Sequence, residues 1–292
     1  MEHIRRSAIK IRESKALSTL AVLGIYIAAG LLGAMLYISL PWAAWISLLA
    51  ADIAATAFVF VFSVLFRNAS VYDPYWSVFP PIAMTLICLG KHITPLSAVQ
   101  LIIIWLWGIR LTGNWLYTFQ GLRHQDWRYT MLEKKTGRLY PLVNFFGIHL
   151  VPTLIVFFCV LPAVYTSEHH IEGSPLSALF LLMSLGAIVL QATADLQMHA
   201  FRKTHQGSIN QTGLWTYSRH PNYLGEILMW WGIAMSVVCV AQDRIWLIMG
   251  AVVNTALFLF VSIPLADQRQ SLKPGYDAYA QHTWKLLPIR HK

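Results

Sequence analysis

The sequence predicts an all-α fold, a polytopic integral membrane helical bundle of about 7–8 transmembrane helices. Hydrophobic residues make up 57% of the 292 residues and charged residues only 12%, against roughly 25% charged residues in soluble domains. The mean hydropathy is +0.53. Apolar runs near the ~20 residues needed to cross a bilayer recur along the chain, and Lys and Arg lie mainly between them. This composition excludes a soluble globular protein and a disordered chain.

Eight apolar runs are the predicted spans. The third contains Pro80 and Pro81 and is short, so a kinked or re-entrant segment is the alternative for it. The first follows a basic segment, as a signal peptide would, but it exceeds the roughly 7–15 residues of a signal-peptide core and is expected to be a retained anchor. The runs cover residues 17–40, 42–66, 76–90, 96–119, 145–165, 176–194, 224–241 and 245–263.

The basic residues predict the orientation of these spans. Lys91 and Arg244 lie in one set of loops, Arg110 lies within a span, and the other nineteen of the 22 Lys and Arg occupy the opposite set. Because basic loops stay in the cytoplasm, both termini are expected there. The net charge of +9 is therefore a topology signal, and no nucleic-acid partner is expected. The nineteen lie in 1–16, 67–75, 120–140, 195–223 and after 263.

Metal chemistry is not expected. Cys88, Cys159 and Cys239 all lie in apolar runs, so neither a disulfide framework nor a CxxC site is available. Neither HExxH nor the histidine clusters of membrane di-iron oxidases occur. The pair His169 and His170 is expected in a solvated outer loop rather than in a metal site.

The polar stretch from Asp195 to Glu226 is where chemistry is expected, because membrane chains bury ionisable groups only when these are paired or functional. Asp195 and Arg202 are seven residues apart and share one face of a continuing helix, either as a surface salt bridge or as part of a site. Pro221 suits the first turn of a helix. Asn222 and Glu226 would then share a face of that helix, one turn apart.

This helix start is a predicted anion site. Helix N-termini favour anions, and Arg219 and His220 add donors beside the start. Neither GxGxxG nor the GxxxxGK[ST] phosphate loop occurs, so side chains on helices and loops would have to hold a nucleotide.

The segment GLWTYSRHPNYLGE at 213–226, preceded by Asp195 and Arg202, resembles the C-terminal signature of the steroid 5α-reductase superfamily, to which sterol C14 and Δ7 reductases are related. Arg269, PGYDAY at 274–279 and LLPI at 286–289 are similar to the closing pattern of that family. Upstream, VYDPYWSV at 71–78 and the motifs within 107–129 resemble the bacterial branch.

The resemblance implies NADPH in a cytoplasm-facing cavity of a bacterial inner-membrane protein. It implies a single membrane domain over 1–292, with a basic N-terminus at 1–16, spans on the substrate side at 17–194 and an NADPH-binding region at 195–292. Tyr276 and Tyr279 could instead lock the tail against the bundle. The cofactor contacts carried over are Asp195, Arg202, Tyr217, Arg219, His220, Asn222, Tyr223, Glu226, Arg269, Tyr276 and Tyr279.

The implied reaction is hydride transfer to the activated C=C bond of a lipid-soluble enone, such as a 3-oxo-Δ4 steroid. A second group must then polarise the carbonyl or donate a proton. Asp73 is the candidate, although an Asp before Pro is also a helix start signal. The position of the family's catalytic tyrosine falls on Trp107, so Tyr72, Tyr75 or Tyr117 would have to replace that tyrosine.

Arg110 and Asn114 are four residues apart in the fourth predicted span. An arginine inside a span requires a partner, which could be an acidic side chain or a phosphate. Both residues are therefore expected as cofactor contacts.

Two other functions fit parts of the sequence. Isoprenylcysteine and phospholipid methyltransferases, which use S-adenosylmethionine, carry a signature similar to RHPNYLGE. A non-catalytic lipid-binding or assembly protein is the third possibility. Membrane lipids and a lipid-soluble small molecule are the expected partners, and the sequence indicates neither the substrate nor the oligomeric state.

Overall fold

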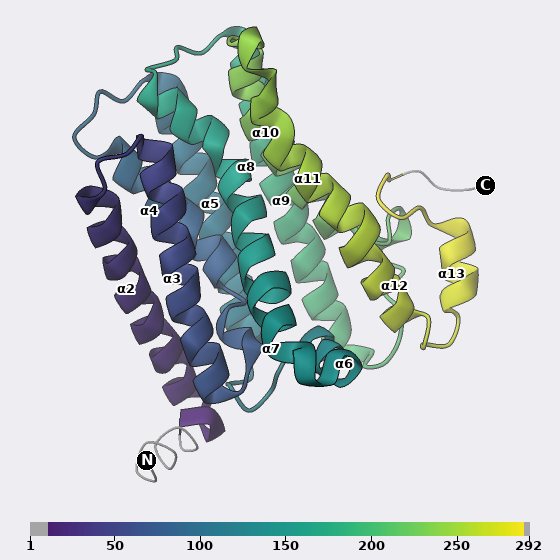
Figure 1. The fold of residues 1–292 in the computed structure, drawn as a ribbon. Coiled ribbons are helices and arrows are strands. Elements are labelled where there is room, and N and C mark those ends of the chain that lie inside the picture. Colours follow the sequence, from purple (N-terminus) through teal and green to yellow (C-terminus); the bar gives the residue numbers. More distant parts are fainter. Residues whose placement is uncertain (1–10, 289–292) are drawn as a thin grey trace. The chain divides into compact units, whose positions relative to one another are not determined.

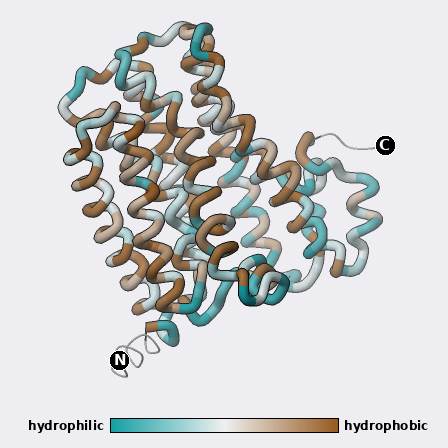
Figure 2. Tube along the Cα trace, in the orientation of Figure 1, coloured by the Kyte–Doolittle hydropathy of each residue, from teal (hydrophilic) through white to brown (hydrophobic). Residues whose placement is uncertain are grey.

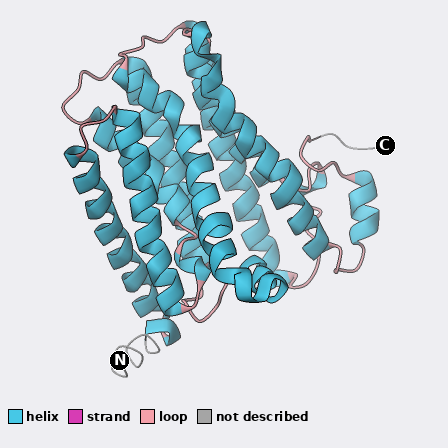
Figure 3. Ribbon diagram, viewed as in Figure 1, coloured by secondary structure: helices cyan, strands magenta, loops and turns pink. Residues whose placement is uncertain are grey.

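A computed structural model of the chain describes residues 11–288 and shows helices and connecting loops, with no strand among these residues (Figure 3). The basic residues Arg5, Arg6, Lys10, Arg290 and Lys292 lie outside the described residues, as does Ile289 of the closing motif. The α-helices are α2 (Lys15–Ser39), α3 (Ala44–Phe66), α4 (Tyr75–Cys88), α5 (Pro95–Thr118), α6 (Trp127–Thr136), α7 (Tyr140–Leu142), α8 (Val151–Glu168), α9 (Pro175–Thr204), α10 (Pro221–Val238), α11 (Met249–Leu257), α12 (Ile263–Gln270) and α13 (Tyr276–His282) (Figure 1).

Short 3₁₀ and π segments connect several of these helices. The π-helices are η3 (Val143–Leu150), which leads into α8, and η6 (Phe258–Ser262), which joins α11 to α12. The 3₁₀ segments are η1 (Ala69–Val71), η2 (Gly137–Leu139), η4 (Gly213–Thr216) and η5 (Gln242–Ile248).

The described residues form an all-α polytopic membrane bundle, as predicted. Apolar residues predominate along the long helices and polar residues gather in the loops and in α13 (Figure 2). The exposed fractions of Leu31, Met35 and Ile38 on α2 are 62%, 67% and 78%, a pattern that suits contact with lipid tails. Helices long and apolar enough to cross a membrane cover Lys15–Ser39, Ala44–Phe66, Pro95–Thr118, Trp127–Glu168, Pro175–Thr204 and Gln242–Gln270.

These six helices are fewer than the seven or eight predicted. The two other predicted spans correspond to α4 and α10. Helix α4 contains 14 residues, including Pro80 and Pro81, and at 1.5 Å per residue its length is only ~21 Å against a hydrocarbon core of ~30 Å. Helix α10 has 18 residues and carries the buried Glu226.

Two compact units make up the chain. The first contains the residues up to His92 together with Trp107–Phe157, and the second contains Ile93–Leu106 together with the residues from Phe158 onward. Helices α5 and α8 each contribute residues to both units. The expected cofactor region, 195–292, falls wholly within the second unit.

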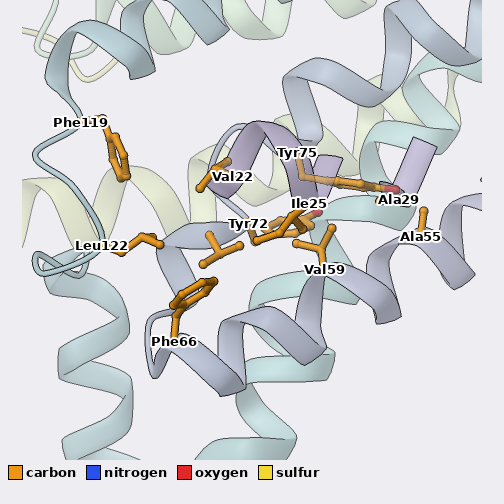
Figure 4. Close-up of a cluster of buried hydrophobic side chains, with 11 residues drawn as sticks. Val22, Ile25, Ala29, Ala55, Val59, Phe66, Tyr72, Tyr75, Phe119 and Leu122 are labelled. Atoms are coloured by element: carbon orange, nitrogen blue, oxygen red, sulfur yellow. The ribbon is translucent and has the colours of Figure 1, made fainter. Parts of the chain in front are cut away.

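The core of the first unit forms where α2 and α3 pack against the loop that leads into α4. Figure 4 shows Tyr72 and Tyr75 among apolar side chains of both helices. The two tyrosine rings are stacked, with centroids 5.3 Å apart. The buried cluster consists of Val22, Ile25, Ala29, Ala55, Val59, Phe66, Val71, Tyr72, Tyr75, Phe119 and Leu122.

In the second unit, α9 and α10 pack along their length because glycines let their backbones approach. A Cβ atom on Gly225 would lie 2.7 Å from the carbonyl oxygen of Ala187, and one on Gly232 would lie 2.6 Å from that of Phe180. Helix α9 begins at a capping box, in which Ser174 and Ser177 exchange side-chain and backbone hydrogen bonds. The neighbour that Gly225 admits is therefore α9 and not a ligand.

Candidate functional site

A pocket of about 460 Å³ lies in the second unit, within the ~300–1,000 Å³ typical of small-molecule and cofactor sites. The end of α9, the loop after it, the start of α10, α12 and α13 form its walls. It is lined by Met198, Phe201, Arg202, His205, Gln206, Gly207, Ser208, Ile209, Asn210, Trp215, Arg219, His220, Asn222, Tyr223, Ala266, Asp267, Gln270, Lys273, Tyr276 and Tyr279. We call it the anion pocket.

The start of α10 is held by Asp267 of α12. His220 is the N-cap residue and Pro221 occupies the first turn, as predicted. His220 Nε2 lies 2.9 Å from Asp267 Oδ1, and Arg219 Nη2 lies 3.2 Å from Asp267 Oδ2. One carboxylate thus fixes two cationic or polar side chains beside the free N–H groups of a helix N-terminus.

Basic side chains gather at the pocket and beside it. Arg202 on α9, Arg269 on α12 and Lys273 after α12 are close enough to repel one another. Burial lowers the pKa of Lys273, and the charges of Arg202 and Arg269 lower that pKa further. Asp195 offsets part of this charge, since it attracts Arg202. Three mutually repelling cations favour binding of an anion with several charges.

Two buried nitrogen donors that line this pocket have no hydrogen-bond acceptor among the described residues. They are Asn210 Nδ2 and Arg219 Nε. Asn210 is 4% exposed and the Arg219 side chain 9%. A buried donor without a partner costs free energy, so both atoms are suited to an acceptor on a ligand.

Aromatic rings form the remaining walls. The His220 and Tyr223 rings are stacked 5.1 Å apart, and Phe201 stacks on His205 at 4.8 Å. Flat faces of this kind can hold a planar heterocycle. The Tyr279 hydroxyl is already used, because it donates to the carbonyl oxygen of Trp215 at 2.6 Å and so anchors the tail.

Seven of the thirteen predicted cofactor residues line the anion pocket, and six do not. Asp195 contacts a lining residue, since Asn222 Nδ2 lies 3.5 Å from its Oδ1 atom. Tyr217 is 47% exposed, outside the pocket lining. Arg110 and Asn114 lie on α5, within the first unit. The seven lining residues are Arg202, Arg219, His220, Asn222, Tyr223, Tyr276 and Tyr279.

Glu226 lies one turn beyond Asn222 on α10, buried and outside the pocket lining. Its Oε1 atom accepts a hydrogen bond of 2.9 Å from Trp230 Nε1. This environment is typical of a carboxylate that finds its hydrogen-bond donors inside the helix bundle.

The predicted catalytic residues Asp73, Tyr72 and Tyr117 all belong to the first unit. Asp73 does not cap α4, whose N-cap residue is Pro74. Its Oδ1 atom accepts a hydrogen bond of 2.6 Å from the Tyr129 hydroxyl. Tyr72 is 1% exposed and bonded to Thr153, whereas Tyr117 is 58% exposed.

Asp52, which the sequence analysis did not single out, lies at a second pocket. It is 1% exposed, its Oδ1 atom accepts a bond of 2.7 Å from the Tyr75 hydroxyl, and its Oδ2 atom has no partner among the described residues. The sequence does mark Asp52 as a candidate functional residue, because it is an acidic residue inside a predicted span.

This second pocket is apolar and narrow, with a volume of about 50 Å³. The small side chains of α2 leave room for it, and Asp52 and Tyr75 supply polar groups to its lining. Because this volume is far below the ~300–1,000 Å³ of typical ligand sites, any lipid-soluble enone would require these helices to separate. We call it the apolar slot; it is lined by Tyr26, Ala29, Gly30, Gly33, Ala34, Tyr37, Leu48, Ala51, Asp52, Ala55, Tyr75, Val78, Phe79, Ile82, Ala83 and Leu86.

Within residues 11–288, no group of three or more His, Cys, Asp or Glu side chains is arranged to hold a metal ion.

Residues 59–283 match the family described as "Protein of unknown function (DUF1295)". The chain belongs to this family. In this DUF1295 protein the matched range includes the whole lining of the anion pocket and begins after Asp52.

The uncharacterized protein C594.04c of Schizosaccharomyces pombe is 26% identical to this DUF1295 protein over 199 residues. The aligned part covers 58% of this chain and 57% of that relative. The similarity thus spans little more than half the length of the relative. No solved structure matches the chain.

Proposed function

We propose that this DUF1295 protein is an NADPH-dependent membrane reductase that transfers hydride to the C=C bond of a lipid-soluble enone. The observation that carries the proposal is the anion pocket, where Arg202 and Lys273 in the lining and Arg269 beside it repel one another and where Asn210 and Arg219 have unpartnered donors. The resemblance of residues 213–226 to the steroid 5α-reductases supports it.

The charge of the pocket favours a phosphorylated nucleotide over S-adenosylmethionine. S-adenosylmethionine carries no phosphate and has a sulfonium cation, which three repelling basic side chains would disfavour. The phosphates of NADPH would instead relieve this repulsion, with Arg219 and the start of α10 as further donors. When bound, NADPH would supply the hydride.

Asp52 and Tyr75 are our candidates for the group that polarises the enone carbonyl and donates a proton. They adjoin an apolar slot, and the free Oδ2 atom of Asp52 can share a proton with a carbonyl oxygen. Asp73 remains the alternative, but its Oδ1 atom already accepts the Tyr129 hydroxyl.

We further propose that the protein lies in a bacterial inner membrane with both termini and the anion pocket on the cytoplasmic side. The distribution of Lys and Arg along the chain supports this orientation.

A binding titration of the detergent-purified protein tests the cofactor. NADPH, NADH and S-adenosylmethionine are added in parallel, and the melting temperature is followed, because a ligand that binds only the folded state raises it. Stabilisation by NADPH is expected. Stabilisation by S-adenosylmethionine alone would contradict the reductase proposal and support a methyltransferase. No response to any of the three ligands would favour a non-catalytic role. NADPH oxidation with an acyl enone and with a 3-oxo-Δ4 steroid then compares the two substrate shapes.

A further inference from the structure

We infer that α6 binds the headgroup of an anionic phospholipid from the membrane around the protein. An open hollow of about 670 Å³ lies along this helix, within the first unit. It is separate from the anion pocket and independent of the proposed reaction. The hollow is lined by Gln125, Trp127, Thr130, Met131, Lys134 and Lys135. We call it the α6 hollow.

One face of α6 forms this hollow, because the lining residues follow the period of a helix. Trp127, Thr130 and Met131 are spaced by three and four residues, and they are half-buried. Lys134 and Lys135 follow one turn later and are exposed. The face therefore presents an aromatic ring and a thioether at one end and two cations at the other.

Contacts within the first unit hold this face in place. Tyr129, on the opposite side of α6, donates its hydroxyl hydrogen to Asp73 Oδ1 at 2.6 Å. Gln125 Oε1 accepts a hydrogen bond of 2.9 Å from the backbone N–H of Ala69. The fold therefore positions the lining before any ligand binds, which lowers the cost of binding.

The α6 hollow adjoins the part of the chain that enters the membrane. Gly137, with a φ of 50°, ends α6, and the following segments lead into α8. Leu139, Leu142 and Phe146 of these segments are more than half exposed, a pattern that suits contact with lipid tails. They begin only four residues after Lys135. The two lysines thus lie where lipid headgroups meet the tails.

The charge of this region favours an anionic headgroup. Five basic residues lie from Arg123 to Arg138, against the two acids Asp126 and Glu133. Asp126 is already engaged, because Arg128 Nε and Nη2 donate to its carboxylate oxygens at 2.9 Å and 3.1 Å. Clusters of about four or more basic residues beside a transmembrane helix attract anionic lipids.

The apolar part of the lining favours a phospholipid over a free phosphate. A free phosphate would contact the two lysines and gain nothing from Trp127 and Met131. A phospholipid carries its phosphate next to glycerol and acyl chains, so one molecule can meet both ends of the face. Tryptophan is also enriched at the level of lipid headgroups.

Native mass spectrometry of the delipidated full-length protein in detergent tests this site, because it resolves individual bound lipids. The dissociation constant of the first dioleoylphosphatidylglycerol is compared with that of dioleoylphosphatidylcholine, which has the same acyl chains. Phosphatidylglycerol should bind more tightly. A lysine near an anionic surface contributes roughly fivefold in affinity, so replacing both Lys134 and Lys135 by Gln should raise the phosphatidylglycerol constant about 25-fold. Replacing both by Arg keeps the charges and should preserve the affinity.

The matched control is the double variant Lys203→Gln with Lys285→Gln. It also removes two exposed lysines, which lie in the second unit and do not line the α6 hollow. Equal constants in the wild type and in the variant with Lys134→Gln and Lys135→Gln would overturn the inference. An equal loss in the control, or equal affinity for the two lipids in the wild type, would overturn it as well.

Inorganic phosphate separates a lipid site from a site for free anions. Its effect on the melting temperature in detergent should be the same in the wild type and in the variant with Lys134→Gln and Lys135→Gln, since phosphate bound at the anion pocket acts on both proteins. A stabilisation by phosphate that this variant loses would show that the α6 hollow binds free anions and would contradict the lipid assignment.

Discussion

The Nε2 atom of His220 lies 2.9 Å from Oδ1 of Asp267, and this contact joins the start of α10 to α12. The same carboxylate holds Arg219. The donors at the helix start are thus oriented by the protein before any ligand arrives, which lowers the cost of binding an anion.

Replacing Arg202 by Gln should weaken NADPH binding. The variant loses one of three basic groups at the anion pocket, so the dissociation constant should rise about tenfold, or ~1.4 kcal/mol. Calorimetric titration of the purified protein measures this value. Lys203→Gln is the control, since Lys203 is exposed on the same turn but does not line the pocket; an equal loss in both variants would show that general charge, not the pocket, governs affinity.

Asp52→Asn should remove turnover while NADPH binding is kept, because the amide cannot donate the acid proton. Tyr75→Phe should also lower turnover, since it removes the hydroxyl that donates to Asp52. The measurement is NADPH oxidation with an enone, beside a binding titration. If Asp73→Asn abolishes turnover and Asp52→Asn does not, then Asp73 is the proton donor and our assignment is wrong.

Protein stability should depend on the protonation of Asp73. Burial raises the pKa of Asp73 to about 6, although the Tyr129 hydrogen bond and the Arg128 charge oppose the rise. The unfolded chain releases this proton near pH ~3.9. Between these values the folded state binds more protons, so the contribution to stability is present at low pH and is lost as pH rises toward 6.

Melting temperatures measured from pH 4 to pH 7 test this sign. Asp73→Asn should flatten the decline, whereas Asp277→Asn, an exposed acid of α13, should not alter it. A wild-type melting temperature that rises through the same range with a slope that Asp73→Asn removes would contradict the prediction.

Gly232→Ala should destabilise the second unit. Its new methyl group would meet Ser184 Oγ and the Phe180 carbonyl oxygen where α9 and α10 pack, and overpacking of this kind costs about 1–3 kcal/mol. A lower melting temperature is expected. Gly186→Ala on α9 meets nothing within 4 Å and should be neutral or slightly stabilising, as alanine favours helix; similar losses in both would show that the effect is not one of packing.

Parts of the candidate site were predictable because they are local in the chain. A proline in the first turn and the Arg219–His220 pair before it predict a helix start with donors, and the structure has α10 begin there. Asp267 was missed because nothing in its own sequence neighbourhood marks it, and Asn210 was missed because, although it lies in the predicted polar stretch, no motif singles it out there. They become part of the pocket lining only because segments distant in the chain come together in the fold.

The sequence by itself determined the all-α membrane class, because each span must satisfy its own backbone hydrogen bonds and present about 20 apolar residues to lipid. The tertiary structure decided which faces of these helices meet, because a helix that is apolar on every side has no hydrophobic stripe that marks its inward face. The approach of Tyr75 to Asp52, and of Thr153 to Thr56 ninety-seven positions away, arises only when the helices pack.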